Sequence, residues 1–359
     1  MYTQQLVFVA AALSAPILSS ANCMYGTSLF PRAEGATVEV SNFGYVGLQG
    51  PLNWAALSAE NSACATSKVQ SPINIDSTIQ LAQEAPKMVI KDVEAAEFEN
   101  LGTTVEVICN GTTTFGGKDF SLQQFHFHTP SEHRVAEEYF PLEIHMVHEA
   151  ADGSGALVVI ALTFQLSEDG ATTELLSAVT ENLAKIATPG TVTETGPLKF
   201  AEVINHVQTT PLFQYTGSLT TPPCAEGLTF LVTEKPLPLN VKTYNEIKSV
   251  VKFNSRYTQN SPGQENLIAV GASALAGAGG AVAGEDARNG TAAAGNATVV
   301  VKPKPSGGAA ASTSAKGTAT SKTAAAATGN AEVKVEGEHH CILGSCREVT
   351  KAKRFRRRR

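Results

Sequence analysis

Residues 121–147 constrain the fold of this chain more than any other stretch. The first part carries His126 and His128 one residue apart in an apolar segment, and the last part carries His145 in another. Side chains alternate between the two faces of a strand, so His126 and His128 share one face. The link at residues 129–141 is long enough to return the chain antiparallel. Two adjacent strands would then direct three imidazoles to one point.

Three histidines at one point predict a metal site. Three neutral imidazoles with an open fourth position are typical of catalytic zinc, whereas structural zinc usually has four ligands and favours Cys. Imidazole also suits Cu, Fe and Ni, and this stretch contains no Cys. A lone His-x-His in an apolar strand is more often structural. Gln124 and Glu143 favour a metal site, because each precedes a histidine by two residues and could orient its ring.

Further motifs occur in a fixed order between residues 40 and 265. They are FGY at residues 43–45, QSPINID at 70–76, QFHFH at 124–128, SEH at 131–133, EIHMVH at 143–148, YTGSLTTPPC at 215–224 and NSR at 254–256. Together they resemble the alpha-class carbonic anhydrases, in their secreted, eukaryotic, fungal type. The resemblance implies a mainly β fold with peripheral helices. Its centre would be a large twisted, mostly antiparallel sheet of the alpha-carbonic anhydrase type.

The resemblance also implies an activity. It predicts a lyase with one Zn²⁺ per chain, held by His126, His128 and His145. The reaction would be reversible hydration of CO2 to bicarbonate and a proton, by attack of zinc-bound hydroxide. The Thr220 hydroxyl would accept a hydrogen bond from the hydroxide and donate a hydrogen bond to Glu132. Taken alone, Thr220 reads as a turn threonine and Glu132 as a loop carboxylate.

Other residues take roles from the same resemblance. The imidazoles would be oriented by Gln124, by Glu143 and by the backbone of Asn254. His133 and His148 are interpreted as structural. The remaining implied sets are an apolar CO2 wall of Val147, Val159 and Leu219, substrate contacts from Thr220 and Thr221, a water network with Tyr45 and Thr103, and a disulfide between Cys64 and Cys224. From the residues alone, the wall positions read as core packing, and only the resemblance argues for a role in binding.

Three positions depart from the family pattern. Thr103 stands where fast members carry a proton-shuttling histidine, and Thr cannot relay a proton at neutral pH as His can. We therefore expect turnover limited by proton release and dependent on buffer. Glu106 replaces a usually neutral cleft residue. Phe230 stands where a Trp normally packs below the zinc.

Composition divides the chain into five parts. Residues 1–21 read as a secretory signal peptide, 22–34 as a leader, and 35–268 as the catalytic domain. Residues 269–330 are rich in Ala, Gly, Ser and Thr and predict a disordered linker. Residues 331–359 form a basic tail with two Cys. No other stretch is apolar enough to span a bilayer, so we expect a soluble protein that is extracellular or in the cell wall.

Within the catalytic domain, short apolar and alternating segments predict strands at residues 105–109, 122–128, 142–147, 157–164 and 228–232. Turn residues separate them at 110–111, 116–117 and 152–153. The best helical patterns lie at residues 172–186 and 241–251. A secreted protein permits disulfides and glycosylation. Cys109 reads as a buried thiol, whereas the pairing of Cys23 is open. Cys341 and Cys346 could pair with each other or join two chains into an oligomer. The glycosylation acceptors are Asn110, Asn289 and Asn296.

Charge is distributed unevenly along the chain. The last 13 residues carry eight Lys or Arg and one Glu, so their removal changes the formal net charge from −6 to −13. Such a tail could bind an anionic surface, although many basic tails are only solvated. We expect no nucleic-acid partner. The alternatives to the enzyme are a non-catalytic carbonic-anhydrase-like binding domain and a zinc hydrolase acting mainly on esters. A non-catalytic domain would be expected to have lost a zinc ligand, and this chain keeps all three histidines. A dedicated esterase would be expected to carry a substrate-binding motif, and none is present in the sequence.

Overall fold

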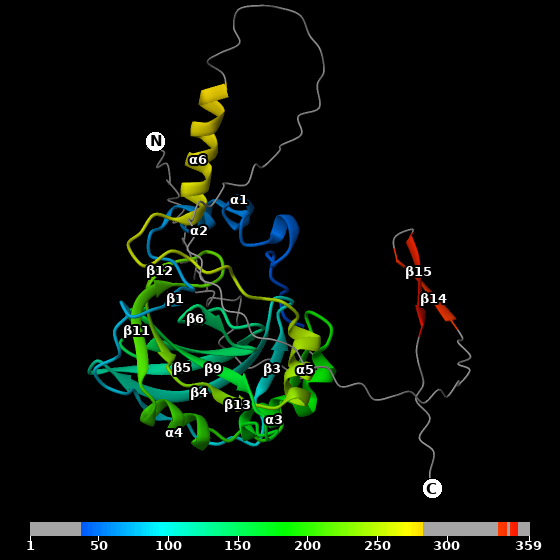
Figure 1. The fold of residues 1–359 in the computed structure, drawn as a ribbon. Helices are drawn as coiled ribbons and strands as arrows, with labels where there is room; N and C mark the ends of the chain where they lie inside the picture. Colours follow the sequence, from blue (N-terminus) through cyan, green and yellow to red (C-terminus); the bar gives the residue numbers. More distant parts are fainter. Residues whose placement is uncertain (1–36, 283–336, 343–344, 351–359) are drawn as a thin grey trace, which may run out of the picture. The chain divides into compact units, whose positions relative to one another are not determined.

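The structure is a computed structural model that describes residues 37–282, 337–342 and 345–350. The chain divides into one unit through Asn289 and a second from Gly290 onward. Strands dominate the described part of the first unit, which confirms the predicted mainly β fold class. A ten-stranded sheet forms its centre (Figure 1). In spatial order the strands are β10 (Val192–Glu194), β3 (Glu97–Asn100), β4 (Val105–Phe115), β5 (Lys118–His128), β8 (Leu142–Ala150), β9 (Leu157–Leu166), β12 (Glu226–Thr233) and β11 (Leu212–Ser218), with β2 (Lys87–Val89) on β4 and β13 (Leu237–Leu239) on β9.

Most neighbouring strands in this sheet are antiparallel, as predicted. The run from β3 through β4, β5 and β8 to β9 is antiparallel throughout. β9 pairs in parallel with both β12 and β13, so the whole sheet is mixed. A parallel pair cannot be joined by a hairpin, and here helices occupy the connection between β9 and β12.

The turn predicted at Asn110 and Gly111 is wrong. These residues lie inside β4, where the register with β5 shifts between Ile108 and Gly111. A β-bulge of this kind inserts an extra residue without reversing the chain. The reversal occurs instead at Gly116 and Gly117, whose φ angles of 59° and 73° favour glycine. The sequence signal for a turn therefore marked a bulge, and Asn110 is exposed there.

The two central strands are buried on both faces. Phe125 and Phe127 of β5 join Ile144 and Met146 of β8 in the main hydrophobic core. Side chains of the peripheral helices complete this core, among them Leu176 of α3. The histidines alternate with these residues and therefore lie on the opposite face. The core thus holds the two strands in the register that brings the histidines together.

Helices surround the sheet at its periphery (Figure 1). The helix predicted at residues 172–186 is present as α3 and η3, and α5 coincides with the second predicted helix. α4 was not predicted. The helices are η1 (Gly47–Gln49), α1 (Trp54–Leu57), η2 (Ala59–Ser62), α2 (Ala63–Thr66), α3 (Glu174–Leu183), η3 (Ala184–Ile186), α4 (Ala201–Thr209), α5 (Val241–Val251) and α6 (Leu267–Val282); a small sheet contains β1 (Asn74–Ile75), β6 (Arg134–Val135) and β7 (Glu138–Tyr139).

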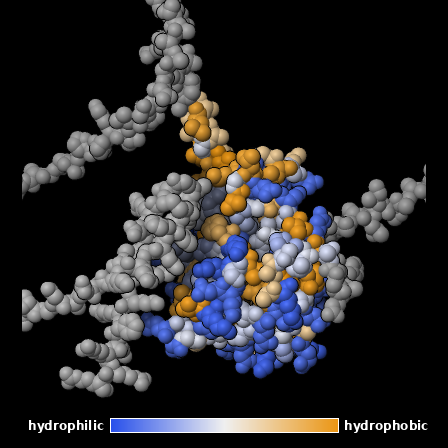
Figure 2. Space-filling model, turned by 90° about the vertical axis from the view of Figure 1, so that its right-hand side faces the viewer, coloured by the Kyte–Doolittle hydropathy of each residue, from blue (hydrophilic) through white to orange (hydrophobic). Residues whose placement is uncertain are grey.

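α6 corrects the predicted disordered linker. The helix crosses the expected boundary at residue 268 and continues to Val282. The side chain of Asn266 fixes its start by donating to the carbonyls of Cys64 and Ser67. Alanine and leucine favour helix strongly enough here to outweigh the glycines. Val270 and Leu275 are exposed, and the base of the helix is part of the orange surface in Figure 2.

The described part of the second unit is a hairpin of β14 (Gly337–Ile342) and β15 (Ser345–Thr350). Cys341 and Cys346 are directly opposite in its register. The predicted signal peptide, leader, Asn289 and Asn296 lie outside the described residues, as does most of the basic tail. Within the described ranges, no helix has both the length and the apolar character needed to cross a bilayer.

Candidate metal centre

Three histidines meet at the centre of the sheet. His126 and His128 come from β5, and His145 is the direct cross-strand partner of His126 on β8. One nitrogen from each ring lies within 4.8 Å of the other two. All three residues are at most 2% exposed. The structure therefore brings together the three residues that the sequence predicted as metal ligands.

Each ring is held by a hydrogen bond on the side away from this centre. Nδ1 of His126 lies 2.8 Å from Oε1 of Gln124, and Nδ1 of His128 lies 3.0 Å from the carbonyl of Asn254. Nε2 of His145 lies 2.7 Å from Oε1 of Glu143. An oxygen partner requires the bonded ring nitrogen to carry the proton, so the other nitrogen of each ring offers a lone pair. The donor set therefore fits a metal ion that favours imidazole, such as Zn²⁺.

The protonation states suit metal binding. Burial lowers the pKa of His126 well below its ordinary value, and it lowers the pKa of His128 to about 4. The pKa of His145 is also lowered, again chiefly by burial. Neutral imidazole is the form that binds metal, so no proton has to be displaced near pH 7.

Glu143 connects the centre to a chain of buried groups. Its Oε1 also lies 2.6 Å from Nδ1 of His133, and its Oε2 accepts from the backbone N–H groups of residues 132 and 133. Burial alone would raise the pKa of Glu143, but its histidine neighbours hold that pKa well below the ordinary value. Nε2 of His133 lies 2.6 Å from the hydroxyl of Tyr215, which in turn lies 2.8 Å from Oγ of Ser71. These bonds fix the position of Glu143 and hence of the His145 ring.

Glu132 lies beside the centre with Thr220 close to it. Oε1 of Glu132 accepts from the backbone N–H of Arg256 at 2.9 Å. Oε2 lies 3.5 Å from Nε2 of His128 and 4.0 Å from Nδ1 of His145. Burial raises the pKa of Glu132 to about 7, while His145, the N–H of Arg256 and the Thr220 hydroxyl act in the opposite direction. A cation at the centre would stabilise the ionised carboxylate further.

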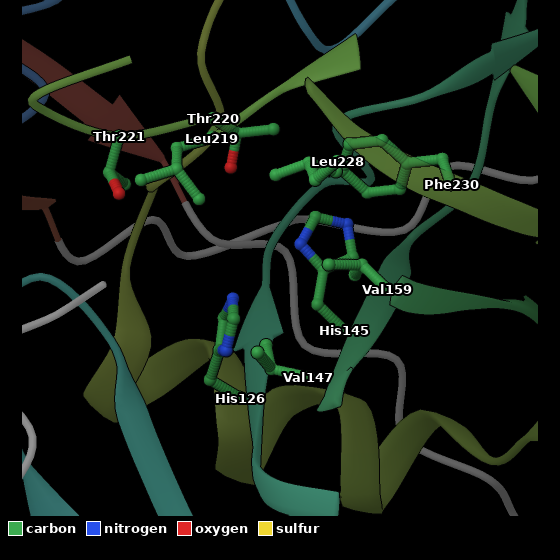
Figure 3. Close-up of a pocket in the computed structure, with 9 residues that line it drawn as sticks. All are labelled: His126, His145, Val147, Val159, Leu219, Thr220, Thr221, Leu228 and Phe230. Atoms are coloured by element: carbon green, nitrogen blue, oxygen red, sulfur yellow. The ribbon is translucent and has the colours of Figure 1, made fainter. Parts of the chain in front are cut away.

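A small, mostly apolar pocket opens beside two of the histidines. It encloses about 230 Å³ of empty space, part of it open to solvent. Figure 3 shows the Thr220 hydroxyl directed into this pocket, on the side facing the imidazoles. The pocket brings together the predicted wall residues, the two threonines and two residues of β12. Its lining is His126, His145, Val147, Val159, Leu219, Thr220, Thr221, Leu228 and Phe230.

The loop that carries Thr220 is tied to the N-terminal part of the domain. Cys64 and Cys224 form the predicted disulfide, with a sequence separation of 160. Gln70 strengthens the connection, because its Nε2 donates to the carbonyl of Cys224 at 3.0 Å. The guanidinium of Arg256 donates to Oε1 of Gln70 at 2.8 Å. These contacts hold Thr220 in place from outside the metal centre.

The other predicted site residues lie around the metal centre and the pocket. Asn254 is buried, and its side chain donates to the carbonyls of Thr103 and Phe127. Tyr45 packs against the aromatic ring of Trp54. The hydroxyl of Thr103 lies 3.0 Å from that of Ser41. His148 lies on the core side of β8, as its place in the alternation predicts.

Sequence reasoning missed several residues that shape the site. Ser71 and Arg256 lie in recognised motifs, but their contacts join parts of the chain 144 or 124 residues apart, beyond any local signal. Leu228 could have been found, because it shares a strand face with Phe230. The ring of Phe230 lies 5.5 Å from that of His145 and stacks on Tyr215 at 5.2 Å.

Comparison with known proteins decides the family. The model of the eukaryotic-type carbonic anhydrases matches residues 49–267. The chain belongs to this family. A solved alpha carbonic anhydrase from the fungus Aspergillus oryzae is 44% identical, with a TM-score of 0.62, and the match covers 65% of this chain and 99% of that one.

More distant relatives agree. A carbonic anhydrase of Pectobacterium atrosepticum is 36% identical over 214 residues, which is 58% of this chain and 83% of the relative. The alpha-carbonic anhydrase of Thermovibrio ammonificans, solved with the inhibitor sulfanilamide, is 31% identical with a TM-score of 0.55, covering 63% of this chain and 98% of that one. The predicted class of enzyme, a carbonic anhydrase, is thereby confirmed, and membership supports CO2 hydration in general.

Proposed function

We propose that this protein is an active zinc-dependent carbonic anhydrase that interconverts CO2 and bicarbonate. The observation that carries the proposal is the buried set of three neutral histidines, each with an outer hydrogen bond and an inward lone pair. Family members that lack a ligand would not need this arrangement. Its completeness favours catalysis over a non-catalytic binding domain.

His126, His128 and His145 would hold one zinc ion beside the pocket. A zinc ion there supplies a hydroxide at neutral pH and stabilises the negative charge formed on the substrate. Gln124, Glu143 and the carbonyl of Asn254 keep the rings oriented. Because these groups are buried and mutually bonded, they would lose little entropy on metal binding.

Glu132 and Thr220 would orient the nucleophile. A carboxylate can only accept hydrogen bonds, so it would fix the Thr220 hydroxyl as a donor toward Glu132. The oxygen of Thr220 could then only accept from the attacking group, which sets the direction of the attacking lone pair. The N–H of Arg256 holds the carboxylate in position for this purpose.

The pocket would hold the substrate. CO2 is small and apolar, and Val147, Val159 and Leu219 offer it an apolar wall beside the histidines. Leu228 and Phe230 extend that wall from β12. Thr221 adds a buried hydroxyl-bearing residue to the lining, where it could contact bicarbonate.

The remaining sequence interpretations fit a secreted enzyme. A buried disulfide is compatible with an oxidising compartment. Asn110 is exposed and accessible to glycosylation. We propose cleavage of residues 1–21, a catalytic domain that begins at residue 35, and a basic tail at residues 331–359 that binds an anionic surface.

Stopped-flow CO2 hydration on purified protein tests the proposed function. The wild type should be active, contain about one zinc per chain and be inhibited by a sulfonamide. His145→Ala should lose zinc and activity together. His206→Ala is the matched control, because His206 lies on α4 and its ring bonds to the carbonyl of Lys235 and the hydroxyl of Thr210, not to the metal centre. Bound zinc without activity in the wild type would contradict catalysis and favour a binding role.

A further inference from the structure

A row of glutamates extends from the metal centre across the sheet. Glu106 on β4 is the direct cross-strand partner of His126 on β5. Glu99 on β3 is the direct partner of Glu106. Glu97 lies two residues earlier on β3 and shares the same face. Glu194 on β10 is the partner of Glu97. β3, β4 and β5 lie side by side (Figure 1), so the row shares one face with the histidines.

Exposure increases along this row. Glu106 is 0% exposed and Glu99 is 1% exposed. Glu97 is half-buried, and Glu194 is exposed on the edge strand. Charged carboxylates are rarely buried without a purpose, because desolvation disfavours them. The four glutamates therefore lie in register from the histidines to the edge of the sheet, and the two nearest the histidines are buried.

CO2 hydration releases one proton for each bicarbonate, and that proton must leave a buried centre. Thr103 cannot carry it, because a threonine hydroxyl does not ionise near neutral pH. A carboxylate can accept a proton and release it again. Of the two buried glutamates in the row, Glu106 lies on β4, directly opposite the ligand His126. Glu99 lies one strand further away, on β3.

We propose that Glu99 is the internal proton acceptor of the reaction and that Glu97 passes the proton on to solvent. This inference rests on the proposed function. An O–H bond of the reacting water breaks, and the proton passes through intervening water to form a new O–H bond on a Glu99 carboxylate oxygen. It then moves by way of Glu97 to a buffer base, and Glu99 returns to its ionised form. Glu106 keeps the intervening strand polar, and Glu194 marks the exit.

The test compares Glu99→Gln with Glu94→Gln by stopped-flow CO2 hydration at low buffer. Glu94 is exposed and lies outside the row, so its variant makes the same change in charge. Glu99→Gln should lower kcat about tenfold with kcat/KM unchanged, because only proton release is slowed. Imidazole buffer should restore the lost rate, and Glu94→Gln should behave as wild type. Glu99→His should keep most of the rate, since imidazole also relays protons.

A second measurement observes the Glu99 carboxyl group itself. The carboxyl carbon resonance of Glu99, assigned by its loss in Glu99→Gln, should titrate at the pH where kcat of the wild type rises. An active wild type whose Glu99→Gln variant keeps its kcat at low buffer would overturn the proton route alone. A loss of rate that imidazole does not restore would also overturn it. A wild type without CO2 hydration would overturn the proposed function and this inference with it.

Discussion

Breaking the Cys64–Cys224 disulfide should cost much of the stability of the catalytic domain. The bridge spans a sequence separation of 160. In the chain-entropy model, closing a loop of that length lowers the entropy of the unfolded chain enough to contribute about 5 kcal/mol at 25 °C. Both cysteines are fully buried, so two unpaired side chains would also remain in a packed cluster with Trp54.

The hydrogen bonds around the disulfide should remain when it is removed. The carbonyl of Cys64 would still accept from Arg256 and Asn266, and that of Cys224 from Gln70. We therefore expect a folded variant with a lower free energy of unfolding rather than an unfolded chain. A loss of about 3–5 kcal/mol corresponds to a fall in Tm of roughly 6–20 °C for a domain of this size.

The assay is thermal and urea unfolding of a Cys64→Ala/Cys224→Ala variant, followed by circular dichroism. Dithiothreitol should lower the Tm of the wild type to a similar degree and leave the variant unaffected. Cys341→Ala/Cys346→Ala is the control, and it should respond to dithiothreitol as the wild type does. A fall in Tm below about 2 °C in the variant would refute the loop-entropy reasoning.

Two further predictions follow from buried polar groups. His148 has a pKa lowered to about 4 by burial, so between pH 6.5 and 4 the unfolded chain binds a proton there that the folded metal-free protein does not. The free energy of unfolding should fall by about 3 kcal/mol from this group as pH drops through that window. In urea titrations at a series of fixed pH values, His148→Gln should lose less stability over the window than the wild type. An equal loss in the two proteins would exclude His148 as a cause. Tyr215→Phe should cost about 1–3 kcal/mol in the same assay, because His133 and Ser71 each lose a buried partner, and no change would show that water replaces the hydroxyl.

Local patterns predicted the strands that carry the histidines. Polar and apolar residues alternate from Gln124 to His128 in β5 and from Leu142 to Met146 in β8, because one face enters the main core and the other holds the metal centre. A one-residue shift would exchange these faces, so the register was readable from sequence. The same reasoning predicted α5, where the apolar positions recur at helical spacing.

Other features escaped prediction for physical reasons. Asn110 and Gly111 favour a turn locally, but pairing on both sides of β4 turns them into a bulge. Glycines within residues 269–282 argued against helix, yet anchoring by Asn266 supplies a start from which α6 can continue.

Contacts across long sequence distances left no local signal. The backbone N–H that holds Glu132 belongs to Arg256, and any residue type with an N–H could supply that bond. The hydrogen bond between His133 and Tyr215 joins residues 82 positions apart. Family motifs indicated that these residues belong to the site, but only the fold shows which atoms meet.

X-ray absorption at the zinc edge of the purified protein tests the central claim most directly. We predict one zinc with three imidazole nitrogens at about 2.0–2.1 Å and a single oxygen ligand completing a tetrahedral shell. His126→Ala should remove one imidazole from that shell or abolish zinc binding. Sulfur ligands, fewer than three imidazoles or no bound zinc in the wild type would contradict the assignment of His126, His128 and His145 as the metal centre.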